Sequence, residues 1–567
     1  MSNEKMQRIL LVGINAKFIH SNLAVRCLRK YLEAHTPYRA QIAEYTINQE
    51  FETIMREIYG KNPDILGFSC YIWNFELVKK LTLELKKVLP ETVIVWGGPE
   101  VSYDSEAYLG RYADHIVCGE GEAAFAALVS EFAAGQASKP LWQGVPTDLD
   151  ALPPACADPE ELSHRILYYE SSRGCPFRCQ YCLSSLDKTL HYRSLELVLA
   201  DLDTFLARRV PQVKLIDRTF NCDRERAKAV WWHLLAHDNG VTNFHFEIAG
   251  ELLDEESLAL LSQARPGLFQ LELGVQSLNC DTLREICRPA ELDRLFQAVR
   301  QLLAGGNIHL HLDLIAGLPE EGLDSFIRSF NGVYALGPHQ LQLGFLKVLK
   351  GTGIYRNREK YGLLFTDEPP YEVLRTKWLS YPELLRLKRA EEMLERYHNS
   401  GRYRLECTYL ASLFESPFAF YDALGAYYEE RGLRLVAVSE ADSYTVLYDF
   451  LTALGRGDRK RFAALARYDF CAHGKPKKWP DWMEIRAGEG EKQRLRAFFD
   501  APENRELFPQ YAALEGRQIA RLLEVQLFPF DPLTGRERQT AVLFQYGERD
   551  ILGNARAVDV TARYYRE

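Results

Sequence analysis

The sequence lacks the hydrophobic runs that a secretion signal or a membrane span requires. Its first apolar run, Ile9–Val12, is far shorter than the roughly 20 residues that cross a bilayer. It also lacks a surplus of basic residues, because 69 lysines and arginines face 78 aspartates and glutamates and the net charge is −9. We therefore expect a cytoplasmic protein without a membrane partner, and nucleic acid is disfavoured as a partner.

Internal repeats, low-complexity tracts and a dense cysteine framework are also missing. The twelve cysteines are spread over 567 residues, and in a cytoplasmic chain they are better read as metal ligands plus buried thiols than as disulfides. The chain is longer than one hydrophobic core usually supports, and 47% of its residues are hydrophobic. These properties predict a globular protein of several domains.

Short apolar runs alternate with amphipathic stretches over the first part of the chain, as in a parallel sheet wound with helices. We predict a doubly wound, Rossmann- or flavodoxin-like domain at residues 1–138. A linker should follow at 139–165, where Leu152-Pro153-Pro154 and Asp158-Pro159 disfavour helix and strand. The predicted strands of this domain are Arg8–Val12, Gln41–Tyr45, Ile65–Ser69, Val93–Trp96 and His115–Cys118.

The alternation resumes at Ile166 and predicts a partial (β/α)6 barrel over residues 166–360. Residues 361–567 should form a mostly helical extension that ends in a few strands. The predicted fold class is therefore α/β, with a doubly wound sheet, a partial barrel and this extension. The predicted barrel strands are Ile166–Glu170, Val213–Ile216, Phe244–Ile248, Phe269–Leu273, His309–Ile315 and Leu341–Phe345.

Three cysteines, Cys175, Cys179 and Cys182, lie within eight residues directly after the first predicted barrel strand. Three thiolates in so short a loop can ligate three irons of one cluster and leave the fourth iron open to an external ligand. A zinc site is the alternative, but zinc usually takes four ligands and no cysteine or histidine nearby completes the set.

The C-x3-C-x2-C spacing, with Tyr181 before the last cysteine, closely resembles the signature of the radical S-adenosylmethionine (SAM) superfamily. The resemblance implies a [4Fe–4S] cluster on these cysteines. It also implies that SAM chelates the open iron and is cleaved to a 5′-deoxyadenosyl radical.

Other segments that resemble this superfamily fall at carboxyl ends of the predicted strands, where barrel active sites are built. Glu272 and Gln276 are candidates for the SAM amine and ribose, although Glu272 could equally be an ion-pair partner in the barrel. The alternative role for Asp217 is that of a helix cap. The implied SAM contacts are Tyr181, Asp217, Glu272, Gln276, Asp313 and Gly317, with Glu247 and Glu251 as weaker candidates.

Glycine-rich or aromatic loops follow the third, fourth and fifth predicted strands, where doubly wound sheets bind ligands. Each loop alone could be turn chemistry. Ahead of a radical SAM barrel, the set resembles the cobalamin-binding domain of cobalamin-dependent radical SAM enzymes. The candidate cobalamin contacts are Ser69, Tyr71, Trp73, Asn74, Gly97, Gly98, Pro99, Gly119, Glu120, Gly121 and Glu122.

The D-x-H-x-x-G segment that supplies a histidine ligand to cobalt in other cobalamin proteins is absent. The resemblance therefore implies cobalamin without a histidine on cobalt, with Tyr71, Trp73 and Asn74 as candidates for its lower face. In the stretch after the first predicted strand, Ser21 or Asn22 either caps the next helix or contacts the corrin side chains or linking tail.

The chain as a whole resembles a cobalamin-dependent radical SAM family with an uncharacterised, DUF4080-like C-terminal domain. The resemblance implies that a substrate radical takes a methyl group from methylcobalamin, with SAM used both to remethylate cobalt and to form the radical. The alternatives are a radical rearrangement or redox step without methyl transfer, and a cobalamin- or SAM-sensing protein. The substrate remains open among small molecule, peptide and RNA, and a flavodoxin- or ferredoxin-type reductant is expected.

Overall fold

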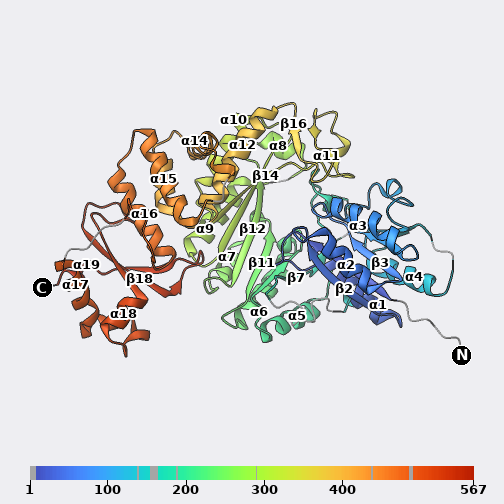
Figure 1. The fold of residues 1–567 in the computed structure, drawn as a ribbon, viewed down its shortest axis with the longest axis horizontal. Helices are drawn as coiled ribbons and strands as arrows, with labels where there is room; N and C mark the ends of the chain where they lie inside the picture. Colours follow the sequence, from blue (N-terminus) through green and yellow to red (C-terminus); the bar gives the residue numbers. More distant parts are fainter. Residues whose placement is uncertain are drawn as a thin grey trace.

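The structure is a computed structural model that describes residues 8–136, 139–153, 164–186, 190–288, 290–435, 438–483 and 489–566. Figure 1 shows three lobes in a row, with the N-terminal sheet at one end, a second parallel sheet in the middle and the C-terminal region at the other end. The predicted fold class is confirmed, because both parallel sheets and the largely helical third region are present.

The N-terminal lobe holds a six-stranded parallel sheet in the order β2-β1-β3-β4-β5-β6. β3 is buried along its whole length, as expected for a central strand covered by helices on both faces. The strands are β1 (Ile9–Asn15), β2 (Ala40–Thr46), β3 (Ile65–Ser69), β4 (Val93–Gly97), β5 (His115–Cys118) and β6 (Leu141–Gln143). The helices are α1 (Leu23–His35), α2 (Phe51–Lys61), α3 (Phe75–Val88) and α4 (Gly121–Ala133).

The sixth strand, β6, was not predicted and lies inside the segment expected to be a linker. It pairs in parallel with β5. It has only three residues, of which Trp142 alone is buried, so its apolar pattern is too short to separate from loop. The N-terminal sheet therefore extends past residue 138, and the segment 139–165 is not wholly a connection.

The second sheet is also parallel and has the order β14-β13-β12-β11-β10-β7, which confirms the six predicted barrel strands. No pairing joins β7 to β14 among the described residues, so the barrel is open on one side. The strands are β7 (Leu167–Tyr169), β10 (Gln212–Leu215), β11 (Asn243–Ile248), β12 (Phe269–Gln276), β13 (His309–Ala316) and β14 (Gln340–Phe345). The helices are α5 (Leu195–Ala207), α6 (Arg224–Ala236), α7 (Glu255–Leu261), α8 (Cys280–Glu285), α9 (Leu292–Gly305) and α10 (Leu323–Tyr334), and β8 (Ser172–Arg173) pairs with β9 (His191–Tyr192).

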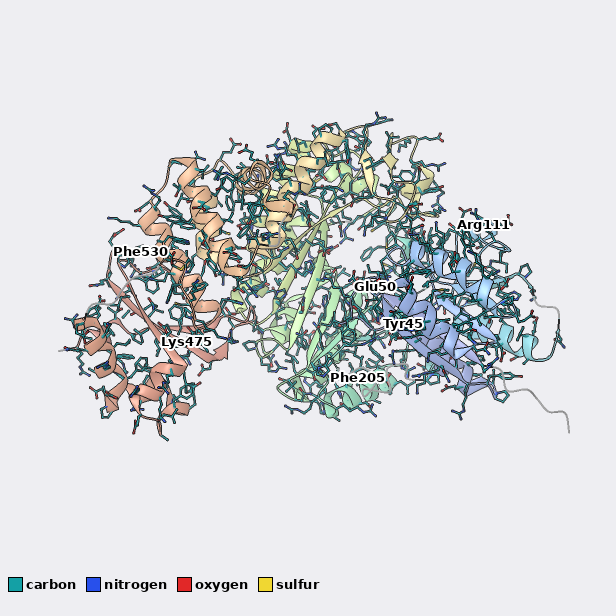
Figure 2. All side chains as sticks on the ribbon, in the orientation of Figure 1. Tyr45, Glu50, Arg111, Phe205, Lys475 and Phe530 are labelled. Carbon is teal, nitrogen blue, oxygen red and sulfur yellow. The ribbon has the colours of Figure 1, made fainter. Side chains whose placement is uncertain are left out.

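The C-terminal region begins with a short hairpin and helices and ends in an antiparallel sheet of β17, β18 and β19. In Figure 2, Phe530 and Lys475 mark this lobe, where Phe530 is buried and Lys475 pairs with Glu524. The helices are α11 (Gly353–Arg356), α12 (Tyr381–Met393), α13 (Arg404–Ala411), α14 (Pro417–Glu430), α15 (Glu440–Leu454), α16 (Arg459–His473), α17 (Glu489–Asp500), α18 (Gly516–Leu522) and α19 (Thr561–Tyr564). The strands are β15 (Leu364–Phe365), β16 (Val373–Arg375), β17 (Leu523–Phe528), β18 (Thr540–Arg549) and β19 (Ala555–Asp559).

One hydrophobic core runs from the barrel into the C-terminal helices. It begins at Leu167 in β7 and reaches Phe462 in α16, so the barrel and these helices share buried side chains. On the other side, the loop after β1 docks on the edge strand β7, where the Ser21 hydroxyl donates to the Ile166 carbonyl at 2.9 Å. The barrel is therefore packed against both neighbours. None of the described helices is long and apolar enough to cross a membrane.

Candidate active site between the two parallel sheets

The cysteine loop follows β7 and lines a cavity of about 150 Å³ at the carboxyl ends of the barrel strands. Cys175, Cys179 and Cys182 all line this cavity, as do side chains from β11, β12 and β13. Arg288 points its guanidinium at the Cys179 sulfur, 3.9 Å away, and also donates to the Gly274 carbonyl. Burial raises the pKa of Cys179 overall, and the Arg288 guanidinium opposes that rise, because a positive charge beside a thiol favours the thiolate form that binds metal.

The donor set fits an iron–sulfur cluster better than a zinc ion. The described lining of this cavity contains three cysteines, no fourth cysteine and no histidine. A structural zinc site would use four such ligands at short, tetrahedral spacing. The three sulfurs are also not among the described groups whose ligand atoms all lie within 4.8 Å of one another, which is the spread that a single ion allows. Three ligands with a wider spread match a cluster that keeps one iron open.

Two neighbouring carboxyl groups in this cavity differ in their ionisation. Glu247 and Glu272 are paired across β11 and β12. Burial raises the pKa of Glu272, but a hydrogen bond from His245 at 2.9 Å and the ammonium of Lys214 at 3.2 Å outweigh it and lower the pKa to about 2. Burial and the charge of Glu272 raise the pKa of Glu247 to about 7. The same cavity thus holds one permanent carboxylate and one that titrates near neutral pH.

The structure brings together most of the predicted SAM residues. The backbone of Gln276 is left-handed, with φ +70°. Its buried side-chain Oε1 has no hydrogen-bond partner among the described residues, so this oxygen is available to accept a hydrogen bond from a ligand. A Cβ at Gly274 would overlap the Gln276 side chain, which explains the glycine there. The predicted residues that line the cavity are Tyr181, Glu272, Gln276 and Asp313, together with the weaker candidate Glu247.

Asp217 and Gly317 are not in the described lining of this cavity, and their contact with SAM stays a prediction. Asp217 is buried and accepts hydrogen bonds from the Ser171 amide and from the hydroxyls of Ser171 and Ser172. It therefore anchors the start of the cysteine loop, and it is not a helix cap either, because Asp223 caps α6. At Gly317, φ is +90° and an added Cβ would meet Val373, so this glycine serves packing.

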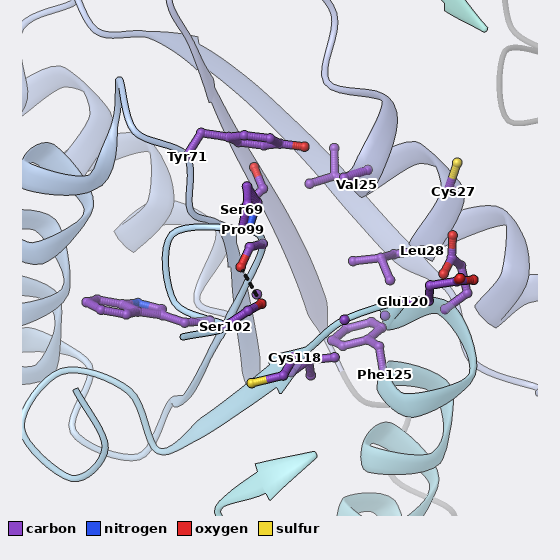
Figure 3. Close-up of a pocket in the computed structure, with 18 of the residues that line it drawn as sticks. Val25, Cys27, Leu28, Ser69, Tyr71, Pro99, Ser102, Cys118, Glu120 and Phe125 are labelled. Carbon is purple, nitrogen blue, oxygen red and sulfur yellow. Dashed lines mark hydrogen bonds between the residues drawn. The ribbon is translucent and has the colours of Figure 1, made fainter. Parts of the chain in front are cut away.

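A second cavity of about 600 Å³ lies at the carboxyl ends of β3, β4 and β5 and is closed on one side by the barrel. Figure 3 shows Tyr71, Ser69, Pro99 and Ser102 along one wall and Phe125, Leu28 and Val25 along the other. Most of the lining is apolar side chain or backbone, as ligand pockets for large cofactors usually are. The predicted residues that line it are Ser69, Tyr71, Gly97, Gly98, Pro99, Gly119, Glu120, Gly121 and Glu122.

Trp73 and Asn74 do not line this second cavity, contrary to expectation. Asn74 is fully buried, and its side-chain amide donates to the carbonyls of Ile14 and Ser69. Trp73 is 43% exposed and stacks on Tyr71 with ring centroids 4.4 Å apart. Tyr71 therefore faces the cavity, and the other two support its loop. Asn22 caps α1 through a hydrogen bond from the Val25 amide at 3.2 Å.

An arginine directly before the cysteine loop ties the two sheets together. Arg173 contacts Glu120, which follows β5, at 2.6 Å, Glu122 in the first turn of α4 at 2.9 Å, and Glu170 at 2.8 Å. Burial lowers the pKa of Arg173, but these carboxylates raise it well above its ordinary value, so it stays charged. Glu120 and Glu122 thus line the second cavity and also hold the barrel against it.

Sequence reasoning missed three arginines: Arg173, Arg218 and Arg288. Arg218 follows β10 and lines both cavities, and Arg288 follows α8 and contacts Cys179. The sequence signal that could have found them was their position after a predicted barrel strand or beside the cysteine motif. Arginine is common on surfaces, however, and only the fold shows which ones turn inward.

Comparison with known families agrees with this geometry. The B12 binding domain model matches residues 9–129, and the radical SAM superfamily model matches residues 169–331. The fold and the two cavities therefore define a radical SAM protein that carries a B12-binding domain. A third model, a domain of unknown function named DUF4080, matches residues 359–544. The chain therefore carries, in order, a B12-binding domain, a radical SAM domain and a DUF4080 region, which is the domain order that the sequence predicted.

Two curated relatives are similar to this chain over part of their length. The cobalamin-dependent radical SAM methyltransferase TokK of Streptomyces tokunonensis is 26% identical over 53% of this chain and 50% of that protein. The 2-(S-pantetheinyl)-carbapenam-3-carboxylate methyltransferase of Streptantibioticus cattleyicolor is 26% identical over 65% of this chain and 62% of its own length. The chain thus spans about half to three-fifths of these relatives.

The structure of the cobalamin-dependent SAM radical enzyme OxsB, with aqua-cobalamin and SAM bound, superposes with a TM-score of 0.56 at 15% identity. It covers 82% of this chain and 79% of that one. At this identity the similarity concerns the fold.

Proposed function

We propose that this protein is a cobalamin-dependent radical SAM enzyme that methylates an unactivated carbon of its substrate. One observation carries the proposal. The cavity with the three cysteines and the cavity of the B12-binding domain open beside each other and share Arg218 in their linings. A substrate held at that junction would be in reach of both cofactors.

The chain's own residues would hold each group. The cluster would be bound by Cys175, Cys179 and Cys182, SAM by the side chains around Glu272 and Gln276, and cobalamin by the turns that contain Gly97, Gly98, Gly119 and Gly121. When bound, the cluster supplies the electron that cleaves SAM, and cobalamin carries the methyl group. A flavodoxin- or ferredoxin-type reductant and a cytoplasmic location complete the proposal.

Glu272 is prepared to meet a positively charged ligand. Lys214 and His245 keep it ionised and fix its orientation, so it can face the ammonium of SAM without a change of protonation. Gln276 offers an unpaired acceptor in the same cavity. Both side chains are therefore positioned before the ligand arrives, which lowers the cost of ordering them.

Arg173 would hold the two cofactor sites at a fixed distance from each other. From its position two residues before Cys175 it binds Glu120 and Glu122 at the start of α4, and its side chain is only 16% exposed. A largely enclosed arginine bound by three carboxylates resists separation, because Glu120, Glu122 and Glu170 would lose their shared cation. This contact would also keep water out of the space where a carbon radical is formed.

Anaerobic purification with cobalamin supplied, followed by reconstitution of iron and sulfide, tests the proposal. The parent protein should retain cobalamin, bind about four irons per chain and convert SAM to 5′-deoxyadenosine when reduced. The Cys175/Cys179/Cys182→Ala variant should retain cobalamin without cleaving SAM. A product heavier by one methyl group would support methylation, whereas an unchanged mass would favour rearrangement or redox chemistry. A parent protein that never cleaves SAM would leave only a sensing role.

A further inference from the structure

Arg218 occupies the junction of the two cavities. It is the residue that the described linings of both cavities have in common. Burial raises the pKa of Tyr71 in one cavity and the pKa of Glu247 in the other. The positive charge of Arg218 opposes both rises, so it acts on groups in each cavity. The guanidinium therefore lies where a substrate would have to pass or rest.

The backbone around Arg218 is held on both sides, whereas its side chain is exposed. Asp217 is buried and bound by Ser171 and Ser172. Thr219 is buried, lies 3.7 Å from the Cys175 sulfur and donates its hydroxyl to the Arg218 carbonyl. A flexible side chain on such a fixed turn can reorient toward a ligand without moving the cluster loop.

Arg218 differs from the other two arginines of the site in having no fixed partner. Arg173 is bound by three carboxylates, and Arg288 by the Cys179 sulfur and the Gly274 carbonyl. No described group lies within hydrogen-bond or ion-pair distance of the Arg218 guanidinium. An arginine presented in a cleft without a partner is suited to bind a carboxylate or a phosphate through two parallel hydrogen bonds.

We propose that Arg218 binds an anionic group of the substrate, a carboxylate or a phosphate, so that the substrate is a small organic acid or phosphate ester. This inference rests on the proposed function, since it assumes that the substrate lies between the two cofactors. Arg288 is already bound on the cysteine side, and on the other side Arg173 is bound by Glu170, Glu120 and Glu122. Arg218 is thus the positive charge of the junction that is left for a substrate anion.

Chemical labelling of arginine in the parent protein provides the test. The full chain, loaded with cluster, cobalamin and SAM, is treated with phenylglyoxal, and modification of Arg218 is followed by peptide mass spectrometry. Inorganic phosphate and acetate are the anionic probes, and acetamide is the neutral probe of similar shape. Phosphate and acetate should each slow the labelling of Arg218 by about fivefold or more near saturation, and acetamide should have no effect.

Arg224 supplies the internal control, because it lies on α6 outside both linings. Its labelling should not respond to the probes, so a general salt effect would be visible. If phosphate and acetate leave the labelling rate of Arg218 unchanged, the inference is overturned. Labelling already blocked by SAM or by cobalamin would also overturn it, because Arg218 would then serve a cofactor.

An Arg218→Lys variant and an Arg218→Gln variant extend the test to a second measurement. In the parent, phosphate should perturb the visible absorbance of bound cobalamin at low concentration. Arg218→Lys should need about tenfold more phosphate, and Arg218→Gln should show no response. If cobalamin binding and SAM cleavage themselves fail, the proposed function falls. If both hold and Arg218 ignores anions, only this inference falls.

Discussion

The two cavities are built from different parts of the chain. The cysteine cavity is small, about 150 Å³, and is lined by thiols, carboxylates and arginines. The cavity of the B12-binding domain is about 600 Å³ and is lined mainly by backbone turns and apolar side chains. The first depends on the chemistry of individual side chains and the second on shape. Loss of a cluster ligand should therefore abolish function in the first cavity, whereas a change of shape should weaken binding in the second.

The largest effect is expected from Cys175→Ala. Loss of one of three ligands should prevent a stable cluster, so SAM cleavage should fall by at least about 1,000-fold. The matched control is Cys222→Ala, because Cys222 lies in the turn between β10 and α6, is not in the described lining of the cavity and contacts the Tyr192 hydroxyl at 3.2 Å. Iron content and 5′-deoxyadenosine formation should separate the two variants. Equal iron in both would refute the ligand assignment.

Arg173→Gln should have the next largest effect, since it acts on the contact between the two cavities. It leaves the buried Glu122 and the half-buried Glu120 and Glu170 without their shared cation, and breaking such an ion pair costs up to about 3–5 kcal/mol. We expect a lower urea midpoint and loss of cobalamin during gel filtration. The double variant Arg173→Gln/Glu122→Gln should recover part of the loss, because one unpaired charge is removed. A cost of Arg173→Gln below about 1 kcal/mol would show that the contact is not needed.

The difference between the cavities also explains how much the sequence could predict. Cys175, Cys179 and Cys182 were found because ligand chemistry fixes residue type and spacing. The core strands were found because buried parallel strands are continuous apolar runs. β6 was missed because three residues carry no pattern.

Side-chain direction was the part that sequence could not supply. Asn74 and Trp73 were expected in the cobalamin cavity, yet one bonds to backbone and the other lies outward. Asp217 was chosen as the ligand-binding residue at the end of its strand, whereas the neighbouring Arg218 lines the cavity. A position after a strand indicates the right edge of the sheet, but adjacent residues there point in different directions.

In the shape-dependent cavity, Gly98→Ala should have an intermediate effect. Gly98 has φ +112°, and an added Cβ would lie 2.6 Å from the Cys70 carbonyl oxygen, so the loops after β3 and β4 would have to separate. Gly110→Ala is the control, because its φ is +73° but nothing lies within 4 Å of an added Cβ. Gly110→Ala should cost about 1 kcal/mol from backbone strain alone. Gly98→Ala should cost more and weaken cobalamin binding by about tenfold in a titration. Equal behaviour of the two variants would show that the close approach does not matter.

The smallest effect is expected for Glu247→Gln, and it tests whether ionisable side chains control the cysteine cavity. Because burial and the charge of Glu272 raise the pKa of Glu247 to about 7, this group gains its negative charge as pH rises through neutrality. A positively charged ligand binds the ionised form better, so the affinity for SAM should increase by about three- to fivefold between pH 6 and pH 8. Glu247→Gln should flatten this pH dependence, whereas Glu255→Gln, an exposed position on α7, should keep it. Anaerobic equilibrium dialysis with SAM measures both. A parent affinity that does not change with pH would mean that the ionisation of Glu247 does not affect SAM binding, whereas Glu272 stays ionised throughout this range.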